Sequence, residues 1–139
     1  MSATPFLTSG RVCLTLVAMS TSTICYVADW NETHVKNPRW PPHARFHNGQ
    51  TMSLGLLLGI LTAYYTWRPT RDVVAAKDSL YTAAVLGSLY YVAGISAIFY
   101  PGTKWMDPEF GDGAPQRPFF LAHIALAWVG WWLEMKRLG

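Results

Sequence analysis

The chain has little charge of either sign and no motif for binding nucleotides. Charged residues make up 14% of its 139 positions, against roughly 25% in soluble domains, so an ordinary soluble protein is disfavoured. The formal net charge of +3 at pH 7 is small and spread along the chain, which leaves no basic stripe for a nucleic acid. A glycine-rich phosphate loop and internal repeats are also lacking. We therefore expect no nucleic acid partner.

Cysteine is scarce as well, with two residues in the whole chain. Cys13 and Cys25 lie in one predicted helix, where a separation of twelve residues corresponds to roughly 18 Å along the axis. A disulfide needs two Cα atoms within about 7 Å of each other. These two cysteines are therefore expected to be free packing residues.

Long apolar runs take the place of charge. Four of them are present, each 17 to 21 residues long, and a helix needs roughly 20 residues to cross the hydrocarbon core of a membrane. They predict an all-α integral membrane four-helix bundle that forms a single domain over residues 1–139. The predicted spans are about 6–28, 42–67, 80–100 and 119–136. A cleaved signal peptide is the alternative for the first run, but no clean cleavage site follows it.

A dense polar segment, Asp29–Gln50, lies between the first two spans. It reads DWNETHVKNPRWPPHARFHNGQ and holds three of the four histidines, two of the seven tryptophans and three of the nine prolines. A simple connection between helices needs only a few small polar residues. The segment is therefore the first candidate for a functional site.

Four spans bring further polar residues to the same end of the bundle. The connection between the third and fourth spans adds charged residues that include Asp107, Glu109, Asp112 and Arg117. His123 lies just inside the fourth span, where an ionisable residue is a functional candidate by default. If the second span begins at Pro42, then His43, His47 and Gln50 share one helix face. We expect that face to point inward, with His123 opposite it.

The orientation in the membrane is predicted from the basic residues. The end that carries both termini has six of them and the other end five, which favours cytosolic termini. Asn31-Glu32-Thr33 is an N-glycosylation sequon, which is usable only if the first connection is lumenal. We therefore expect an integral membrane protein of the endoplasmic reticulum.

Three interpretations of the histidines compete. His43 and His47 have a helical spacing that suits a metal, and His34 and His123 could complete the ligand set. Histidines and carboxylates beside an apolar cavity can instead transfer protons. The histidines can also simply bond loop carbonyls and lipid headgroups. Because HxxxH is a common pattern and no cysteine joins it, we expect proton transfer without a metal or a cofactor.

The expected site residues fall into two groups. Those expected to be catalytic are Asp29, Glu32, His43, His47 and His123. Those expected to bind substrate are Trp30, Asn31, His34, Asn37, Arg39, Trp40 and Gln50. Carboxylates and imidazoles would move protons, while aromatic and amide side chains would hold and orient a lipophilic substrate.

The run DWNETHVKNPRWPPHARFHNGQT, about a sixth of the chain, resembles the signature of a family of small four-span membrane proteins from fungi and bacteria. Some fungal relatives belong with polyketide or terpenoid pathways, in which small membrane proteins act as epoxide hydrolases or cyclases. The resemblance implies a membrane-embedded acid–base enzyme that opens an epoxide, by hydrolysis or cyclisation, on a lipophilic polyketide or terpenoid. A carboxylate would then pair with a histidine, and an amide such as Gln50 would orient the nucleophile.

Two alternatives to that function stay open. One is a double-bond isomerase that acts on a sterol-like substrate with the same acid–base groups, and the other is a non-enzymatic, lipid-binding membrane subunit. The expected partners are a lipophilic small-molecule substrate and membrane lipid. Gly55 and Gly59 form a GxxxG pair, which serves either close contact within the bundle or a homodimer.

Overall fold

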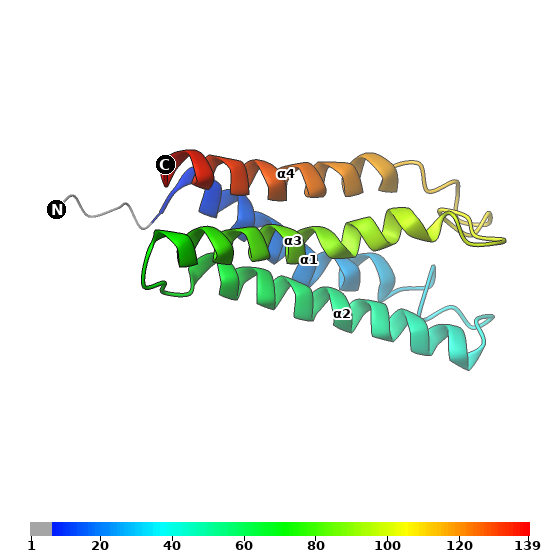
Figure 1. Cartoon of the computed structure of the whole chain (residues 1–139). Helices are drawn as coiled ribbons and strands as arrows, with labels where there is room; N and C mark the ends of the chain where they lie inside the picture. The colour runs from blue at the N-terminus through cyan, green and yellow to red at the C-terminus, as the bar shows by residue number, and fades with distance from the viewer. Residues whose placement is uncertain (1–6) are drawn as a thin grey trace.

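The computed structural model describes residues 7–139 as four helices that run lengthwise side by side (Figure 1). They are α1 (Ser9–Asp29), α2 (Pro42–Trp67), α3 (Val73–Ala97) and α4 (Gln116–Arg137). The described residues contain no strand, so the all-α prediction is confirmed. The start of α1 and the end of α4 lie at one end, which we call the terminal end. The first loop (30–41) and the second loop (98–115) lie at the opposite end, the loop end (Figure 1).

Helix boundaries follow local capping as well as the apolar runs. α2 has the bounds predicted for the second span, with Pro42 in its first turn. α3 begins at Val73 rather than at residue 80, because Asp72 Oδ1 accepts a 2.8 Å hydrogen bond from the Ala75 amide and caps the helix. It ends at residue 97 rather than 100, and α4 begins at residue 116 rather than 119. The predicted start of the first span at residue 6 lies outside the described residues.

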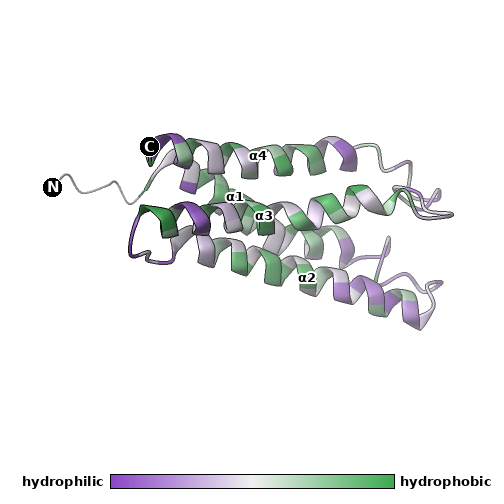
Figure 2. Cartoon of the chain, viewed as in Figure 1, coloured by the Kyte–Doolittle hydropathy of each residue, from purple (hydrophilic) through white to green (hydrophobic). Residues whose placement is uncertain are grey.

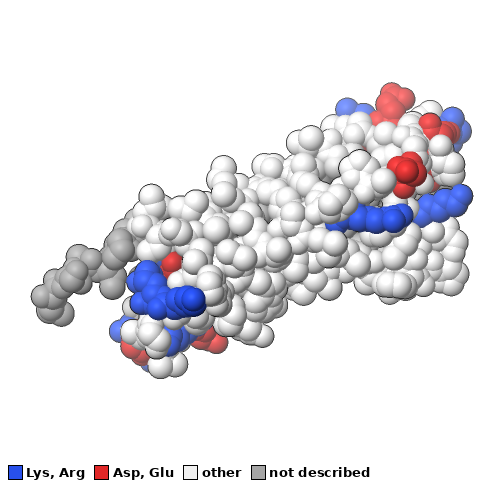
Figure 3. Space-filling model, turned by 90° about the horizontal axis from the view of Figure 1, so that it is seen from above, with Lys and Arg blue, Asp and Glu red and all other residues white. Residues whose placement is uncertain are grey.

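Three of the helices, α1, α3 and α4, are long and apolar enough to cross a membrane. α2 is as long as its neighbours, but its first turns are polar, which Figure 2 shows as purple ribbon at the loop end. On the face seen in Figure 3, charged side chains gather toward the two ends and leave an uncharged region between them. An uncharged middle between charged ends is typical of helix bundles in lipid.

Helices α1 and α2 approach closely because α2 carries glycines on its inner face. A Cβ atom added at Gly59 would lie 2.6 Å from the Ala18 carbonyl oxygen, and one added at Gly55 would lie 2.8 Å from Cys25 Sγ. The GxxxG pair therefore serves contact within the bundle, and the homodimer stays a prediction that these glycines do not support. Both cysteines are free, as predicted.

A buried carboxylate closes the terminal end. Glu134 of α4 is 1% exposed and accepts hydrogen bonds from the Thr8 hydroxyl and from Arg137, whose nearest guanidinium nitrogen is 2.7 Å from Oε2. A Cβ atom added at Gly10 would lie 2.6 Å from Glu134 Cγ. The carboxylate is therefore surrounded by bonded partners and by backbone, with no room for another side chain beside it.

Candidate functional site

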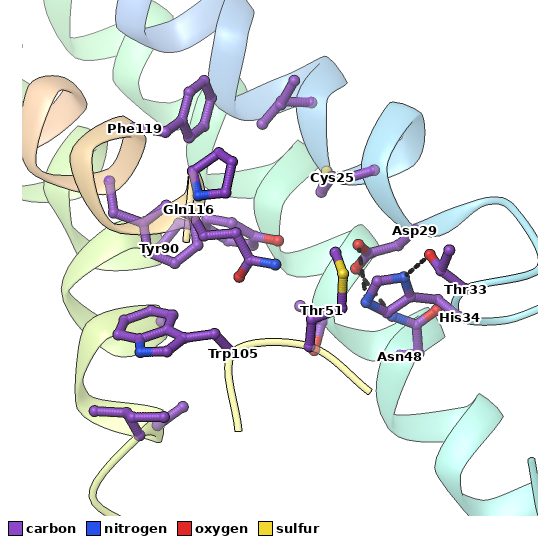
Figure 4. Close-up of a pocket in the computed structure, with 18 of the residues that line it drawn as sticks. Cys25, Asp29, Thr33, His34, Asn48, Thr51, Tyr90, Trp105, Gln116 and Phe119 are labelled. Atoms are coloured by element: carbon purple, nitrogen blue, oxygen red, sulfur yellow. Dashed lines mark hydrogen bonds and ion pairs between the residues drawn. The ribbon is translucent and has the colours of Figure 1, made fainter. Parts of the chain in front are cut away.

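A cavity of about 670 Å³ lies at the loop end of the bundle. All four helices and both loops contribute to its lining. The aromatic rings of Tyr90, Trp105 and Phe119 lie on one side, and Asp29 and His34 lie on the other (Figure 4). The volume falls within the roughly 300–1,000 Å³ that is usual for small-molecule sites. The cavity thus suits a lipophilic molecule with one polar end.

Asp29 is the last residue of α1 and belongs to the polar side of the cavity. Its side chain is 13% exposed. Oδ2 accepts a 2.9 Å hydrogen bond from Asn48 Nδ2 on α2, and Oδ1 lies 3.7 Å from His34 Nε2 in the first loop (Figure 4). The two neighbours hold the carboxylate in place while it still faces the cavity.

The protons of His34 can be assigned from its neighbours. Asn31 Nδ2 donates to the Ala28 carbonyl, which identifies the other amide atom as the acceptor Oδ1. The Thr33 hydroxyl donates its single proton to that oxygen at 2.6 Å. Thr33 Oγ1 must then accept, at 2.7 Å, a proton from His34 Nδ1. Nδ1 is therefore engaged by Thr33, and Nε2 is the ring nitrogen that faces Asp29.

Asn48 is a site residue that the sequence-based prediction missed. It is 8% exposed and lines the cavity, and its Oδ1 has no hydrogen-bond partner within residues 7–139. Its position could have been found from the small residues Gly55, Gly59, Thr62 and Thr66, which follow it on the buried face of α2 at intervals of three or four after Met52. Such a row of small residues marks the contact face of a membrane helix better than histidines do.

The histidine face of α2 points away from the bundle, contrary to the prediction. His43, His47 and Gln50 do share one face, with the two Nε2 atoms 3.0 Å apart and His47 Nδ1 3.3 Å from Gln50 Oε1. All three residues are exposed, and Phe46, itself 63% exposed, stacks on His43. The start of the helix was predicted correctly and its rotation was wrong. The reason is that contact between small residues and α1 sets the inner face.

His123 of α4 has both ring nitrogens engaged and is not among the residues that line the cavity. Nδ1 donates to the Phe119 carbonyl at 2.8 Å, and Nε2 lies 2.7 Å from the Ser20 hydroxyl of α1. Its ring stacks on Tyr91 with centroids 4.6 Å apart. The expected position of His123 opposite the α2 histidines is therefore wrong, and this residue links α4 to α1 and α3.

The two loops are fastened to each other by a pair of contacts that we call the loop latch. Arg39 of the first loop forms an ion pair with Glu109 of the second, and Trp40 Nε1 lies 3.4 Å from Asp107 Oδ2. Asn37 is 2% exposed, and its Oδ1 accepts a 3.0 Å hydrogen bond from the Arg39 amide. Arg39 and Trp40 thus join the two loops and Asn37 supports Arg39, and none of these three residues lines the cavity.

Three further residues that were predicted to belong to the site do not line the cavity either. Glu32 and Trp30 are exposed, while Asn31 supports His34 through Thr33. Within the described part of the chain, no group of three or more His, Cys, Asp or Glu residues is placed to hold a metal ion. The metal interpretation of the histidines therefore gains no support. Of the twelve predicted residues, the cavity brings together Asp29 and His34.

A family of unknown function, DUF6640, has a model that matches residues 13–139 of the chain. The match covers most of the described residues, including the whole polar segment Asp29–Gln50. No curated protein and no solved structure matches the chain. The arrangement around Asp29, His34 and Asn48 is therefore the basis for an argument about function.

Proposed function

The chain belongs to DUF6640, the family of unknown function that it matches, and we propose that it is a membrane-embedded acid–base enzyme acting on a lipophilic substrate. The observation that carries the proposal is the pair formed by Asp29 Oδ1 and His34 Nε2, 3.7 Å apart at the polar side of an apolar cavity. A carboxylate and an imidazole in such a position can give protons to a bound substrate and take them from it.

The proposed reaction is the opening of an epoxide. His34 gives the proton on Nε2 to the epoxide oxygen as one C–O bond breaks. Asp29 takes a proton from the water, or from the substrate hydroxyl, whose oxygen forms the new C–O bond. The proton on Asp29 then returns to His34 across the 3.7 Å gap, which restores both groups. Because acid and base are neighbours, the cycle balances without a co-reactant.

The aromatic side of the cavity suits a polyketide or terpenoid skeleton. Tyr90, Trp105 and Phe119 come from α3, the second loop and α4, so they surround the space opposite Asp29 (Figure 4). Apolar walls bind such a skeleton by removing its surface from water. They also strengthen the electrostatic interaction between the reacting groups, because the local dielectric is low.

We also propose that all four helices cross the membrane of the endoplasmic reticulum, with the polar first turns of α2 at the interface. α2 packs against both α1 and α3, so it stays in the bilayer when they span it. Six basic residues at the terminal end against five at the loop end favour cytosolic termini. In intact vesicles, an impermeant thiol reagent should label Arg71→Cys from the cytosolic side and leave Lys36→Cys unlabelled. The reverse pattern would contradict this orientation.

A second candidate function is the shift of a double bond in a sterol-like substrate. Asp29 and His34 lie on the same side of the cavity (Figure 4), so one can remove a proton and the other can return a proton to the same face of the substrate. This reaction adds no water to the product. Incorporation of oxygen from the solvent therefore distinguishes the two functions.

The test is turnover by the full chain in lipid nanodiscs, with limonene oxide and epoxydodecane as epoxide probes and a β,γ-unsaturated steroid ketone as the isomerase probe. Water labelled with heavy oxygen should place the label in a diol product. Asp29→Asn and His34→Gln should each lower turnover by about 10²- to 10⁴-fold, the usual contribution of one general acid or base.

The matched control is Asp78→Asn, which removes an exposed carboxylate near the start of α3, at the terminal end of the bundle. It should keep wild-type turnover. Wild-type turnover by Asp29→Asn and His34→Gln would show that the proposed site is wrong. Binding of the probes without any turnover would contradict the enzyme and favour the alternative, a lipid-binding membrane subunit.

A further inference from the structure

A buried hydrogen-bond acceptor without a partner belongs to a residue of the cavity lining. Asn48 is 8% exposed and lies on the lining, next to Asp29 and His34 (Figure 4). Because Nδ2 donates to the Asp29 carboxylate at 2.9 Å, the amide cannot be turned around, and Oδ1 is the atom left without a partner in the described structure. Buried polar atoms in folded proteins are almost always bonded, so this one needs an explanation.

We propose that Asn48 Oδ1 binds a hydroxyl group of the substrate, so that the substrate is a lipophilic alcohol. The inference rests on the proposed function, because it concerns the same cavity. A hydroxyl can donate its proton to Asn48 Oδ1, whereas an ether or a hydrocarbon can offer no proton. Since Asn48 and His34 adjoin the two oxygens of one carboxylate, the reacting bond lies close to the hydroxyl.

The charges around the cavity favour a neutral donor over a cationic one. Lys104 of the second loop lines the cavity, and His34 is a second cation when it carries both protons. One carboxylate, Asp29, stands against these two groups, and it already accepts from Asn48. An ammonium group would add a further positive charge beside them, which an alcohol does not.

The rigidity of Asn48 makes it able to discriminate between ligands. It stands in the second turn of α2, on the buried face that packs against α1, and its side chain is tied to the end of α1 through Asp29. The amide therefore cannot swing out to meet water when the ligand lacks a hydroxyl. A site built in this way rejects the analogue that leaves its acceptor unpaired.

The experiment compares dodecanol with dodecyl methyl ether, which has a similar length but no donor. Binding to the full chain in nanodiscs is measured by displacement of radiolabelled dodecanol, with partition into empty nanodiscs subtracted. The wild type should bind the alcohol about tenfold more tightly than the ether, as expected for one buried hydrogen bond. In Asn48→Leu the ratio of the two dissociation constants should fall to about one.

Thr62→Val is the matched control, because Thr62 lies on the same buried face of α2 outside the cavity and its hydroxyl donates to the Leu58 carbonyl. The ratio should stay at the wild-type value. Equal affinity of the wild type for alcohol and ether would overturn the inference, and this measurement needs no folded variant. Tighter binding of dodecylamine than of dodecanol would also overturn it.

These outcomes are independent of turnover. The protein could bind dodecanol more tightly than the ether through Asn48 and yet not turn over the epoxide probes. That result would support the hydroxyl site and contradict the proposed reaction. The wild type could instead turn over the epoxide probes and bind alcohol and ether equally well. That result would support the proposed reaction and contradict the hydroxyl site.

Discussion

The bundle holds one carboxylate near each of its ends, Glu134 fully buried and Asp29 with a side chain 13% exposed, and the two are surrounded differently. At the terminal end, Glu134 accepts hydrogen bonds from Thr8 and Arg137, and Gly10 packs directly against it. At the loop end, Asp29 is held on one side by Asn48 and faces a cavity of about 670 Å³ on the other. Glu134 has every direction filled by the protein, whereas Asp29 has one direction open to a ligand.

This difference shows that burial of a charged group does not by itself identify a site. A buried ion pair costs desolvation and often adds little net stability, but removing one partner is strongly unfavourable. Glu134 fits that description of a structural pair. An unpaired buried atom is not enough either, since Trp131 Nε1 also has no partner in residues 7–139 and does not line the cavity. At Asp29 the open space and the unpaired Asn48 Oδ1 occur together.

The largest expected effect separates His34 from the histidines on the outer face of α2. His34→Ala should lower epoxide turnover by about 10²- to 10⁴-fold, because it removes the group paired with Asp29. His43→Ala and His47→Ala should each cost less than about tenfold, because both residues are exposed on the face turned from the cavity. The measurement is initial rate on limonene oxide. Equal losses at all three positions would favour the site that the sequence predicts.

The second effect tests the two carboxylates through stability. Glu134→Gln should lower the free energy of unfolding by about 2–3 kcal/mol, since it leaves the partly buried Arg137 without its charge partner. Asp29→Asn should change it by less than about 1 kcal/mol, because an asparagine can still accept from Asn48 at a partly open position. Thermal unfolding in detergent measures both. Equal destabilisation by the two variants would mean that Asp29 is as much a structural residue as Glu134.

Much of the fold could be predicted from the sequence because it depends on local features. The lengths of the apolar runs indicate four helices, and the Pro41-Pro42 pair marks the start of α2. The rotation of α2 could not be predicted in this way, since it depends on how closely Gly55 and Gly59 approach α1. That approach is a tertiary contact, and a polar row of histidines on the same helix is the more conspicuous pattern in the sequence.

The candidate site was predictable in part for the same reason. Asp29 and His34 stand out as polar residues at the end of an apolar run, and both belong to the predicted set. Their pairing depends on the first loop folding back on α1, which the Asn31 bonds to Ala28 and Thr33 bring about. A short run of side-chain hydrogen bonds of this kind has no periodic signature. The function of Asn48 depends further on which face of α2 is buried.

The third effect tests the contact that sets this rotation. Gly59→Ala should destabilise the protein by about 1–3 kcal/mol, because the new Cβ meets the Ala18 carbonyl at 2.6 Å. Gly49→Ala is the matched control in the same helix, where no atom outside the adjoining backbone of α2 and the two neighbouring residues lies within 4 Å of the added Cβ. It should stabilise the protein by about 0.5–1 kcal/mol, since alanine favours a helix over glycine. Destabilisation of the same size at both positions would mean that α2 does not pack on α1 through Gly59.

The smallest expected effect concerns access to the cavity at the loop end. Both partners of the Arg39–Glu109 ion pair are exposed, and an exposed pair contributes about 0.2–1 kcal/mol. Arg39→Ala should therefore speed the release of dodecanol by no more than about fivefold. Added salt should speed release from the wild type in the same direction, because it screens the pair.

Arg71→Ala is the control for this variant, since Arg71 forms an exposed ion pair with Asp72 in the connection between α2 and α3, far from the loops. It should leave the release rate of dodecanol unchanged. If Arg39→Ala and Arg71→Ala release the ligand at the same rate, the latch does not control access, and the loop end admits ligand by another route. If only Arg39→Ala releases dodecanol faster, the ion pair between the two loops slows release of the ligand. The loop end would then be the route to the cavity, and the closed terminal end would not.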